Sequence, residues 1–131
     1  PGQYQWLEKT KYEWYGTFRA SDGSNVEFSA SMPNDDGWEI SWLRNNSSTR
    51  IKTDPSVAKE IFATIYTMIQ EFVTTVRPEN IFVALNGPDD TKMSIYDRIF
   101  RKLGYSGYQV SDEEELEQYN LEPNFIWYIY N

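Results

Sequence analysis

The chain has 131 residues, carries 20 acidic and 12 basic side chains, and therefore has a formal net charge of −8 at pH 7. It contains neither cysteine nor histidine, whereas 17% of its residues are aromatic. The missing residue types exclude disulfides, thiol nucleophiles, a Ser-His-Asp triad, and cysteine or histidine metal ligands. The acidic balance argues against binding to duplex nucleic acid or to an anionic membrane surface.

The length fits a single domain, 1–131, which at this size should bury roughly two-thirds of the surface of the unfolded chain. The longest apolar runs are too short for a spanning helix, and no basic segment followed by an apolar one opens the chain. We therefore expect a cytoplasmic protein, and the lack of cysteine fits that compartment.

Apolar and polar residues alternate over residues 14–20, 26–32 and 38–42, a pattern typical of strands that are covered on one face. The turn signals Ser21-Asp22-Gly23-Ser24 and Pro33 to Gly37 separate these stretches. The first third of the chain is therefore predicted to be an antiparallel meander of three strands.

Apolar side chains then recur at helical spacing from Val57 to Val76. Asp54 in front of Pro55 is typical of an N-cap followed by proline in the first helical turn, and Arg77-Pro78 predicts the end of the helix. The uninterrupted apolar run 81–85 predicts a strand that is covered on both faces.

A second helix is predicted from about Asp90 to Leu103, with Gly104 as its C-terminal cap, and two further strands near 107–110 and 125–130. The acidic run 112–117 between them lacks the glycine and the ligand spacing of a calcium loop and is interpreted as a solvated loop. The order β-β-β-α-β-α-β-β predicts an α+β fold with a single mixed, mostly antiparallel sheet of about six strands and two main helices.

This order and the string from Ser94 to Tyr105, with Tyr96 near its start and Leu103-Gly104-Tyr105 at its end, resemble the GNAT-type N-acetyltransferase superfamily. The string is similar to the "LYEKLGF" helix and turn of that family. The resemblance covers the chain from Trp38 to the C-terminus and is closest to small phage-encoded members. It implies a truncated GNAT-like topology, because the family's usual two-helix segment after the first strand is missing.

The resemblance also places an acyl-CoA pyrophosphate loop between Arg50 and Phe62. Its candidate cofactor-binding residues are Arg50, Lys52, Thr53, Ser56, Val57, Ala58 and Lys59. The loop is degenerate, because it has no glycine for close backbone approach, Pro55 offers no N–H, and Asp54 adds a negative charge where phosphates would lie. We expect no cofactor, or acetyl-CoA if the protein is an enzyme.

By the same resemblance, Tyr96 matches the tyrosine that protonates the departing thiolate in many family members. The residues alone favour a different interpretation, in which Tyr96 is a core residue on the apolar face beside Ile99 and Phe100. A general base would have to be a carboxylate such as Glu27 or Glu39, which otherwise lie on a solvated sheet face.

The aromatic residues exceed what a two-helix core needs, which favours a protein interface or, alternatively, a densely aromatic core. The segment 1–10 is interpreted as an N-terminal arm, and the strand 125–130, apolar on both faces, is either interior or a sheet edge covered by a partner. The interface candidates are Tyr4, Trp6, Trp127, Tyr128 and Tyr130.

Taken together, the sequence favours a non-catalytic GNAT-like module that binds a protein partner or associates with itself. Resemblance to phage proteins implies a virion component or a host-directed factor, located in the virion or in the cytoplasm of the host cell. The alternative is an acetyl-CoA-dependent N-acetyltransferase, and a weaker one is an acidic decoy of a nucleic-acid-binding protein.

Overall fold

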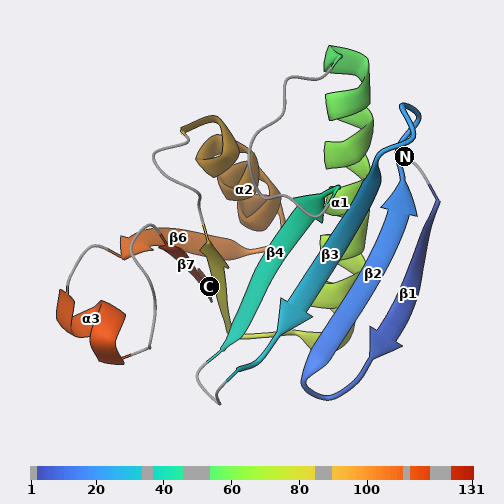
Figure 1. Ribbon diagram of the computed structural model, residues 1–131. Helices are drawn as coiled ribbons and strands as arrows, with labels where there is room; N and C mark the ends of the chain where they lie inside the picture. Colours follow the sequence, from blue (N-terminus) through green and yellow to red (C-terminus); the bar gives the residue numbers. More distant parts are fainter. Residues whose placement is uncertain (1–2, 34–36, 46–53, 85–89, 111–112, 119–124) are drawn as a thin grey trace. The chain divides into compact units, whose positions relative to one another are not determined.

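The structure, a computed structural model, describes residues 3–33, 37–45, 54–84, 90–110, 113–118 and 125–131 (Figure 1). These residues form seven strands and three helices in the chain order β1 (Tyr4–Lys9), β2 (Glu13–Arg19), β3 (Asn25–Ser31), β4 (Trp38–Arg44), α1 (Pro55–Val76), β5 (Asn80–Ala84), α2 (Asp90–Lys102), β6 (Tyr105–Val110), α3 (Glu113–Gln118) and β7 (Phe125–Tyr130).

The strands form one mixed sheet in the order β1-β2-β3-β4-β5-β7-β6. The β1–β2, β2–β3, β5–β7 and β6–β7 pairs are antiparallel, whereas β4 and β5 are parallel, with Trp38 opposite Ile81 and Ile40 opposite Val83. A parallel pair needs a crossover connection, which α1 provides. The predicted α+β class and the mixed, mostly antiparallel sheet are confirmed, with seven strands in place of about six.

The chain divides into two compact units. Unit 1 comprises Pro1–Ser31 and Ser41–Arg77, and unit 2 comprises Met32–Ile40 and Pro78–Asn131. Each unit has buried side chains of its own, for example Phe28 and Phe72 in unit 1 and Phe100 and Tyr128 in unit 2. The units are therefore described one at a time.

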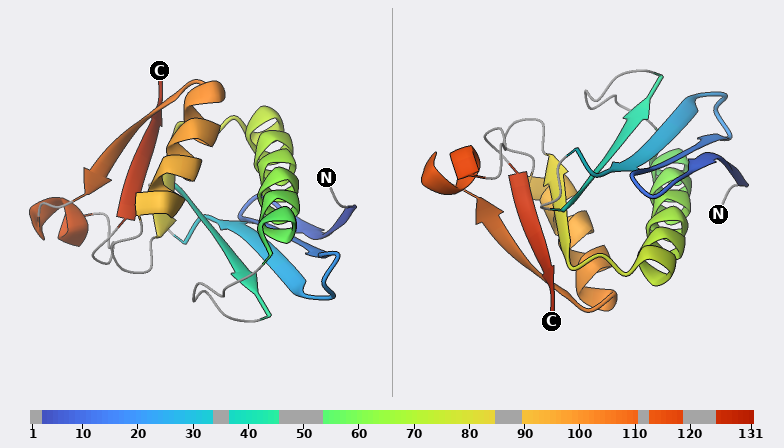
Figure 2. Two further views of the ribbon diagram at one scale, coloured as in Figure 1. Left: turned by 90° about the horizontal axis from the view of Figure 1, so that it is seen from above. Right: turned by 90° about the horizontal axis from the view of Figure 1, so that it is seen from below.

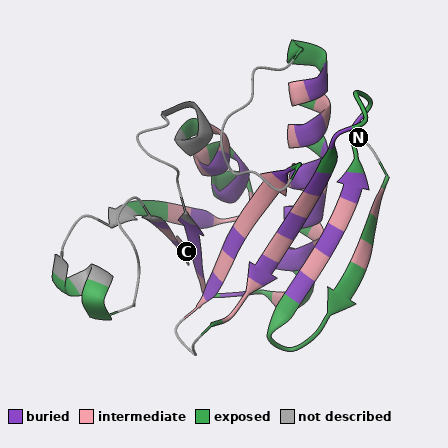
Figure 3. Ribbon diagram, in the orientation of Figure 1, coloured by how far each residue is buried: buried purple, intermediate pink, exposed green. Residues whose placement is uncertain are grey.

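In unit 1 the alternation predicted for β2 and β3 is confirmed. Burial alternates along both strands (Figure 3), and the buried set includes Trp14, Phe18, Val26 and Phe28. Helix α1 lies against this buried face (Figure 2), where Trp14 meets Phe72 of the helix with ring centroids 5.5 Å apart. Polar side chains occupy the opposite face, which fits a sheet covered on one side only.

The boundaries of α1 follow from its caps. Asp54 is the N-cap and Pro55 the first helical residue, as predicted. At the other end Arg77 adopts a left-handed conformation, with φ of 53°, and its N–H donates to the Val73 carbonyl oxygen at 2.8 Å. A non-glycine residue in this conformation was not predicted from the sequence.

Within the segment 1–10, which we interpreted as an arm, Tyr4–Lys9 forms strand β1 and pairs with β2. The register shifts between Trp6 and Glu8, so that side chains past this bulge no longer follow the period of two that identifies a strand. Gly16 lies opposite Trp6, and a Cβ there would approach Trp6 Cε3 to 2.8 Å. The glycine therefore leaves the space in which the indole of β1 packs.

In unit 2, β5 is covered on both faces as predicted, since Ile81, Phe82 and Val83 are all buried. The alternatives for residues 125–130 are resolved, because β7 lies between β5 and β6 and is interior to the sheet. Helix α2 packs on one face of these strands (Figure 2), with the Phe100 ring stacked on Tyr128 at 4.4 Å. It is followed by Gly104, whose φ of +94° matches its predicted capping role.

The acidic stretch, interpreted as a solvated loop, contains the six-residue helix α3. Its described side chains, Glu114, Glu117 and Gln118, are exposed. These acidic residues are therefore solvated as predicted, but they lie on a helix and not in a loop. Among the described residues, no helix has the length and apolar character needed to cross a membrane.

Candidate functional site

Four of the seven residues predicted to bind acyl-CoA lie in the first turn of α1. Ser56 and Lys59 are exposed, Ala58 is half-buried, and Val57 is a core residue. The remaining three, Arg50, Lys52 and Thr53, lie outside the described residues. Val57 points into the core of unit 1, so it cannot contact a ligand through its side chain.

The N-terminus of α1 is capped by its own carboxylate. Asp54 Oδ1 accepts hydrogen bonds from Ser56 N at 2.8 Å and from Ser56 Oγ at 2.6 Å, and the Asp54 carbonyl oxygen accepts from Ala58 N at 3.0 Å. The hydrogen bonds from Ser56 hold the pKa of Asp54 below its ordinary value. An ionised side chain of the protein thus occupies the position at which a helix N-terminus would bind a phosphate.

Tyr96, the candidate general acid, lies within α2 and is only 4% exposed. Its ring stacks on Phe100 with centroids 6.4 Å apart, and Ile99 beside it is buried as well. This location agrees with the core interpretation made from the residues, and its catalytic role stays a prediction.

Two of the predicted interface residues, Tyr4 and Trp6, project from β1 toward the residues of α1 and the core of unit 1. The Tyr4 hydroxyl donates to Glu71 Oε1 at 2.8 Å, and burial together with this carboxylate raises the pKa of Tyr4. The Trp6 ring lies 5.1 Å from Trp14 and 5.8 Å from Phe28 in edge-to-face contacts. These contacts place both side chains in an aromatic cluster of their own unit.

The other three interface candidates lie on β7 and differ in exposure. Tyr128 is fully buried, whereas Trp127 is half-buried, stacks on Phe82 at 5.8 Å and donates from Nε1 to Asn80 Oδ1 at 3.0 Å. Tyr130 is 59% exposed, and Tyr108 of β6, which the sequence reasoning did not single out, is 55% exposed. Tyr108 pairs with Trp127 and Tyr130 with Tyr105, so the two exposed rings lie on opposite faces of the sheet.

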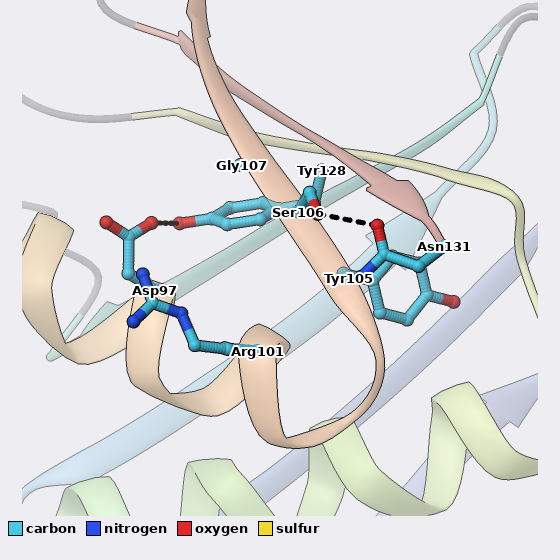
Figure 4. A pocket seen from close by; sticks show the side chains of 7 residues that line it. All are labelled: Asp97, Arg101, Tyr105, Ser106, Gly107, Tyr128 and Asn131. Atoms are coloured by element: carbon cyan, nitrogen blue, oxygen red, sulfur yellow. Dashed lines mark hydrogen bonds between the residues drawn. The ribbon is translucent and has the colours of Figure 1, made fainter.

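A pocket of about 380 Å³ opens between α2 and the strands β6 and β7 (Figure 4). Its polar lining comes from three elements and the residue after β7: Asp97, Arg101, Tyr105, Ser106, Gly107, Tyr128 and Asn131. The Tyr128 hydroxyl donates to Asp97 Oδ1 at 2.6 Å, and Ser106 Oγ donates to Asn131 Oδ1 at 2.5 Å. Both bonds bridge elements and so fix the shape of the pocket.

Burial governs the ionisation of the two tyrosines in this lining. It raises the pKa of Tyr105 to about 12 and, with the neighbouring Asp97 carboxylate, raises that of Tyr128 further above its ordinary value. Both hydroxyls therefore stay protonated near neutral pH and act as hydrogen-bond donors, Tyr105 to the Pro78 carbonyl oxygen and Tyr128 to Asp97.

The sequence reasoning missed this pocket. Asp97 and Tyr128 are 31 residues apart and meet only because α2 packs on the face of β7 that carries Tyr128. Two weak signals were present in the sequence. Asp97 is a carboxylate next to the apolar stripe of the predicted helix, and Gly107 is a glycine within a predicted strand.

Comparison of the chain with protein-family models, with curated proteins and with solved structures gives no match. Within the part of the chain that the structure describes, no cluster of three or more carboxylates could hold a metal ion.

Proposed function

We propose that the protein is a non-catalytic protein-binding module with a truncated GNAT-like topology. Two features support the topology: after β1, the elements follow the order expected from the resemblance apart from the short helix α3, and the string similar to the family motif lies on α2 and the turn after it. The proposed topology rests on the order of the elements, whereas the binding function is argued from the surface of unit 2.

The observation that carries the function is the open edge of β6 together with one exposed tyrosine on each face of the β6–β7 pair. Tyr108 and Tyr130 expose more than half of their surface, and tyrosine is enriched at interfaces because its ring and its hydroxyl both make contacts. Strand β6 is last in the strand order, so its outer edge has no neighbouring strand among the described residues. Such an edge can accept an extended segment of a partner while the tyrosines contact its side chains.

The experiment compares capture of partners by the wild-type chain and by the double variant Tyr108→Ser/Tyr130→Ser, both immobilised and exposed to a lysate of the source cells. Capture should be lost in this variant. The matched control is Leu7→Ser/Tyr12→Ser, since these unit 1 side chains are 53% and 55% exposed. Equal capture by both double variants would contradict the proposal.

The second candidate, an acetyl-CoA-dependent N-acetyltransferase, is favoured by the motif that contains Tyr96 and opposed by the burial of Tyr96 and by the cap of α1. Asp54 already accepts from the Ser56 amide, so a diphosphate would have to displace an ionised carboxylate. Acetyl-CoA at about 100 times its Kd would stabilise the folded protein by about 2.7 kcal/mol. We expect no shift of Tm at millimolar acetyl-CoA, whereas a dose-dependent rise would favour the enzyme.

A further inference from the structure

The pocket beside β6 is not used by the protein-binding function, and its α2 wall carries two opposite charges, Asp97 and Arg101. The Tyr128 hydroxyl donates its single proton to Asp97 Oδ1. The second carboxylate oxygen of Asp97 therefore remains as an acceptor. Asp97 is half-buried, so this oxygen lies in a partly desolvated space in which a cationic donor is strongly attracted.

The second charge comes from Arg101, four residues after Asp97 on α2. Residues four apart lie on the same helix face, one turn from each other. Arg101 is exposed, and among the described residues its guanidinium has no hydrogen bond or ion pair. The planar guanidinium can therefore bind a carboxylate in a bidentate manner.

Gly107 allows β6 to pack closely over the hydrogen-bonded pair of Asp97 and Tyr128. A Cβ at this position would lie 2.7 Å from Tyr128 Cε1 and 3.2 Å from Asp97 Oδ1, so a side chain would clash with the hydrogen-bonded pair. Gly107 is itself exposed, and Figure 4 shows β6 passing over the Tyr128 ring at this glycine. Asp97 and Tyr128 both line the pocket, and the half-buried Asp97 is the more accessible of the two.

We propose that this pocket binds a small zwitterion of the α-amino acid class, with its ammonium group at Asp97 and its carboxylate at Arg101. A ligand with only a positive charge would be repelled by Arg101, and one with only a negative charge by Asp97. A molecule that carries both charges a few atoms apart satisfies both groups. The pocket, about 380 Å³, has room for a ligand of this size.

The test is an NMR titration of the full chain with each of the protein amino acids, up to about 10 mM, a range that detects affinities as weak as millimolar. We expect saturable shifts of the Arg101, Gly107 and Tyr128 amides for at least one amino acid. Its N-acetyl and carboxamide derivatives, each lacking one charge, should bind at least about tenfold more weakly, because a hydrogen bond to a charged group is lost.

The variants Asp97→Asn and Arg101→Gln should each weaken binding by about tenfold or more. Lys102→Gln is the matched control, because Lys102 is an exposed cation in the same turn that does not line the pocket, and it should change the affinity less than twofold. Arg101→Gln alters an exposed side chain and so remains informative if Asp97→Asn perturbs folding. Absence of saturable shifts, or equal binding by the singly charged derivatives, would overturn the proposal.

Discussion

Two tyrosine hydroxyls of unit 2 are held by acceptors of the protein itself. Tyr105 donates to the Pro78 carbonyl oxygen and Tyr128 donates to Asp97, and the two residues are 2% and 1% exposed. A phenolate at either position would be desolvated and would lose its role as a donor. The folded state therefore favours the protonated form of each tyrosine. As a consequence, the stability of unit 2 should decrease at alkaline pH.

The free energy of unfolding should fall as the pH rises from about 10 to about 12. An unfolded tyrosine titrates near 10, whereas the pKa of Tyr105 is raised to about 12 in the folded protein. In this window the folded protein binds more protons than the unfolded chain, so stability decreases with pH. Urea midpoints measured along this range should fall less steeply for Tyr105→Phe than for the wild type.

The relevant measurement is the slope of the urea midpoint against pH. The midpoint at a single pH is not sufficient, because Tyr105→Phe also removes the hydrogen bond to Pro78. Tyr108→Phe is the matched control, since Tyr108 is 55% exposed on the same strand, and its slope should equal that of the wild type. If the urea midpoint of Tyr105→Phe fell with pH as steeply as that of the wild type, burial of the Tyr105 hydroxyl would not be the cause of the loss of stability.

At the scale of elements, α1 has one favourable terminus and one strained terminus. Asp54 accepts from the Ser56 amide at the start, whereas Arg77 holds a φ of 53° at the end, a conformation that L side chains rarely adopt. Glycine has no such cost and is the common residue at this position of a helix.

Arg77→Gly should therefore stabilise the protein by about 0.5–1 kcal/mol, because the strain is removed while the N–H to Val73 carbonyl bond is retained. Chemical denaturation measures the change. Gln70→Gly, at an exposed position inside the same helix, should instead destabilise by about 1 kcal/mol. A loss of stability in Arg77→Gly would mean that the arginine side chain makes an interaction worth more than the strain.

The elements that could be predicted are those in which apolar residues recur with the period of a strand or a helix along the buried face. Strands β2 and β3 alternate without interruption, and α1 has both a continuous apolar stripe and a cap with proline after it. Strand β1 could not be recognised, because the bulge after Trp6 breaks its period. The pairing of β7 between β5 and β6 is equally invisible in a linear pattern, since strand order depends on contacts between distant segments.

The same reason explains which site residues were predicted. Tyr96 was found because it belongs to a local motif, and the core interpretation of it followed from its helical spacing. Asp97, Gly107 and Tyr128 lie on three different elements, so their juxtaposition is a property of the fold and has no signature in any one segment. Tyr108 was passed over because exposure of an aromatic side chain in a strand depends on which neighbours cover it.

At the scale of the whole molecule, the net charge of −8 on 131 residues opposes the association of identical copies. We expect a monomer at low ionic strength, and any self-association should increase with salt, because the Debye length shortens to about 8 Å at physiological ionic strength. Light scattering at low and high salt measures this. Oligomers that form at low salt and dissociate when salt is added would contradict it and would favour self-association through charged contacts.

The packing of Trp6 against Trp14 has an optical consequence. The two indoles come from different strands, β1 and β2, and are held edge to face at 5.1 Å and 78°. Indoles fixed at such a distance couple their strong electronic transitions, so this pair should contribute a pair of dichroism bands of opposite sign in the far ultraviolet. These bands would vanish when β1 detaches, which gives unit 1 an intrinsic reporter for the docking of its first strand without any attached label.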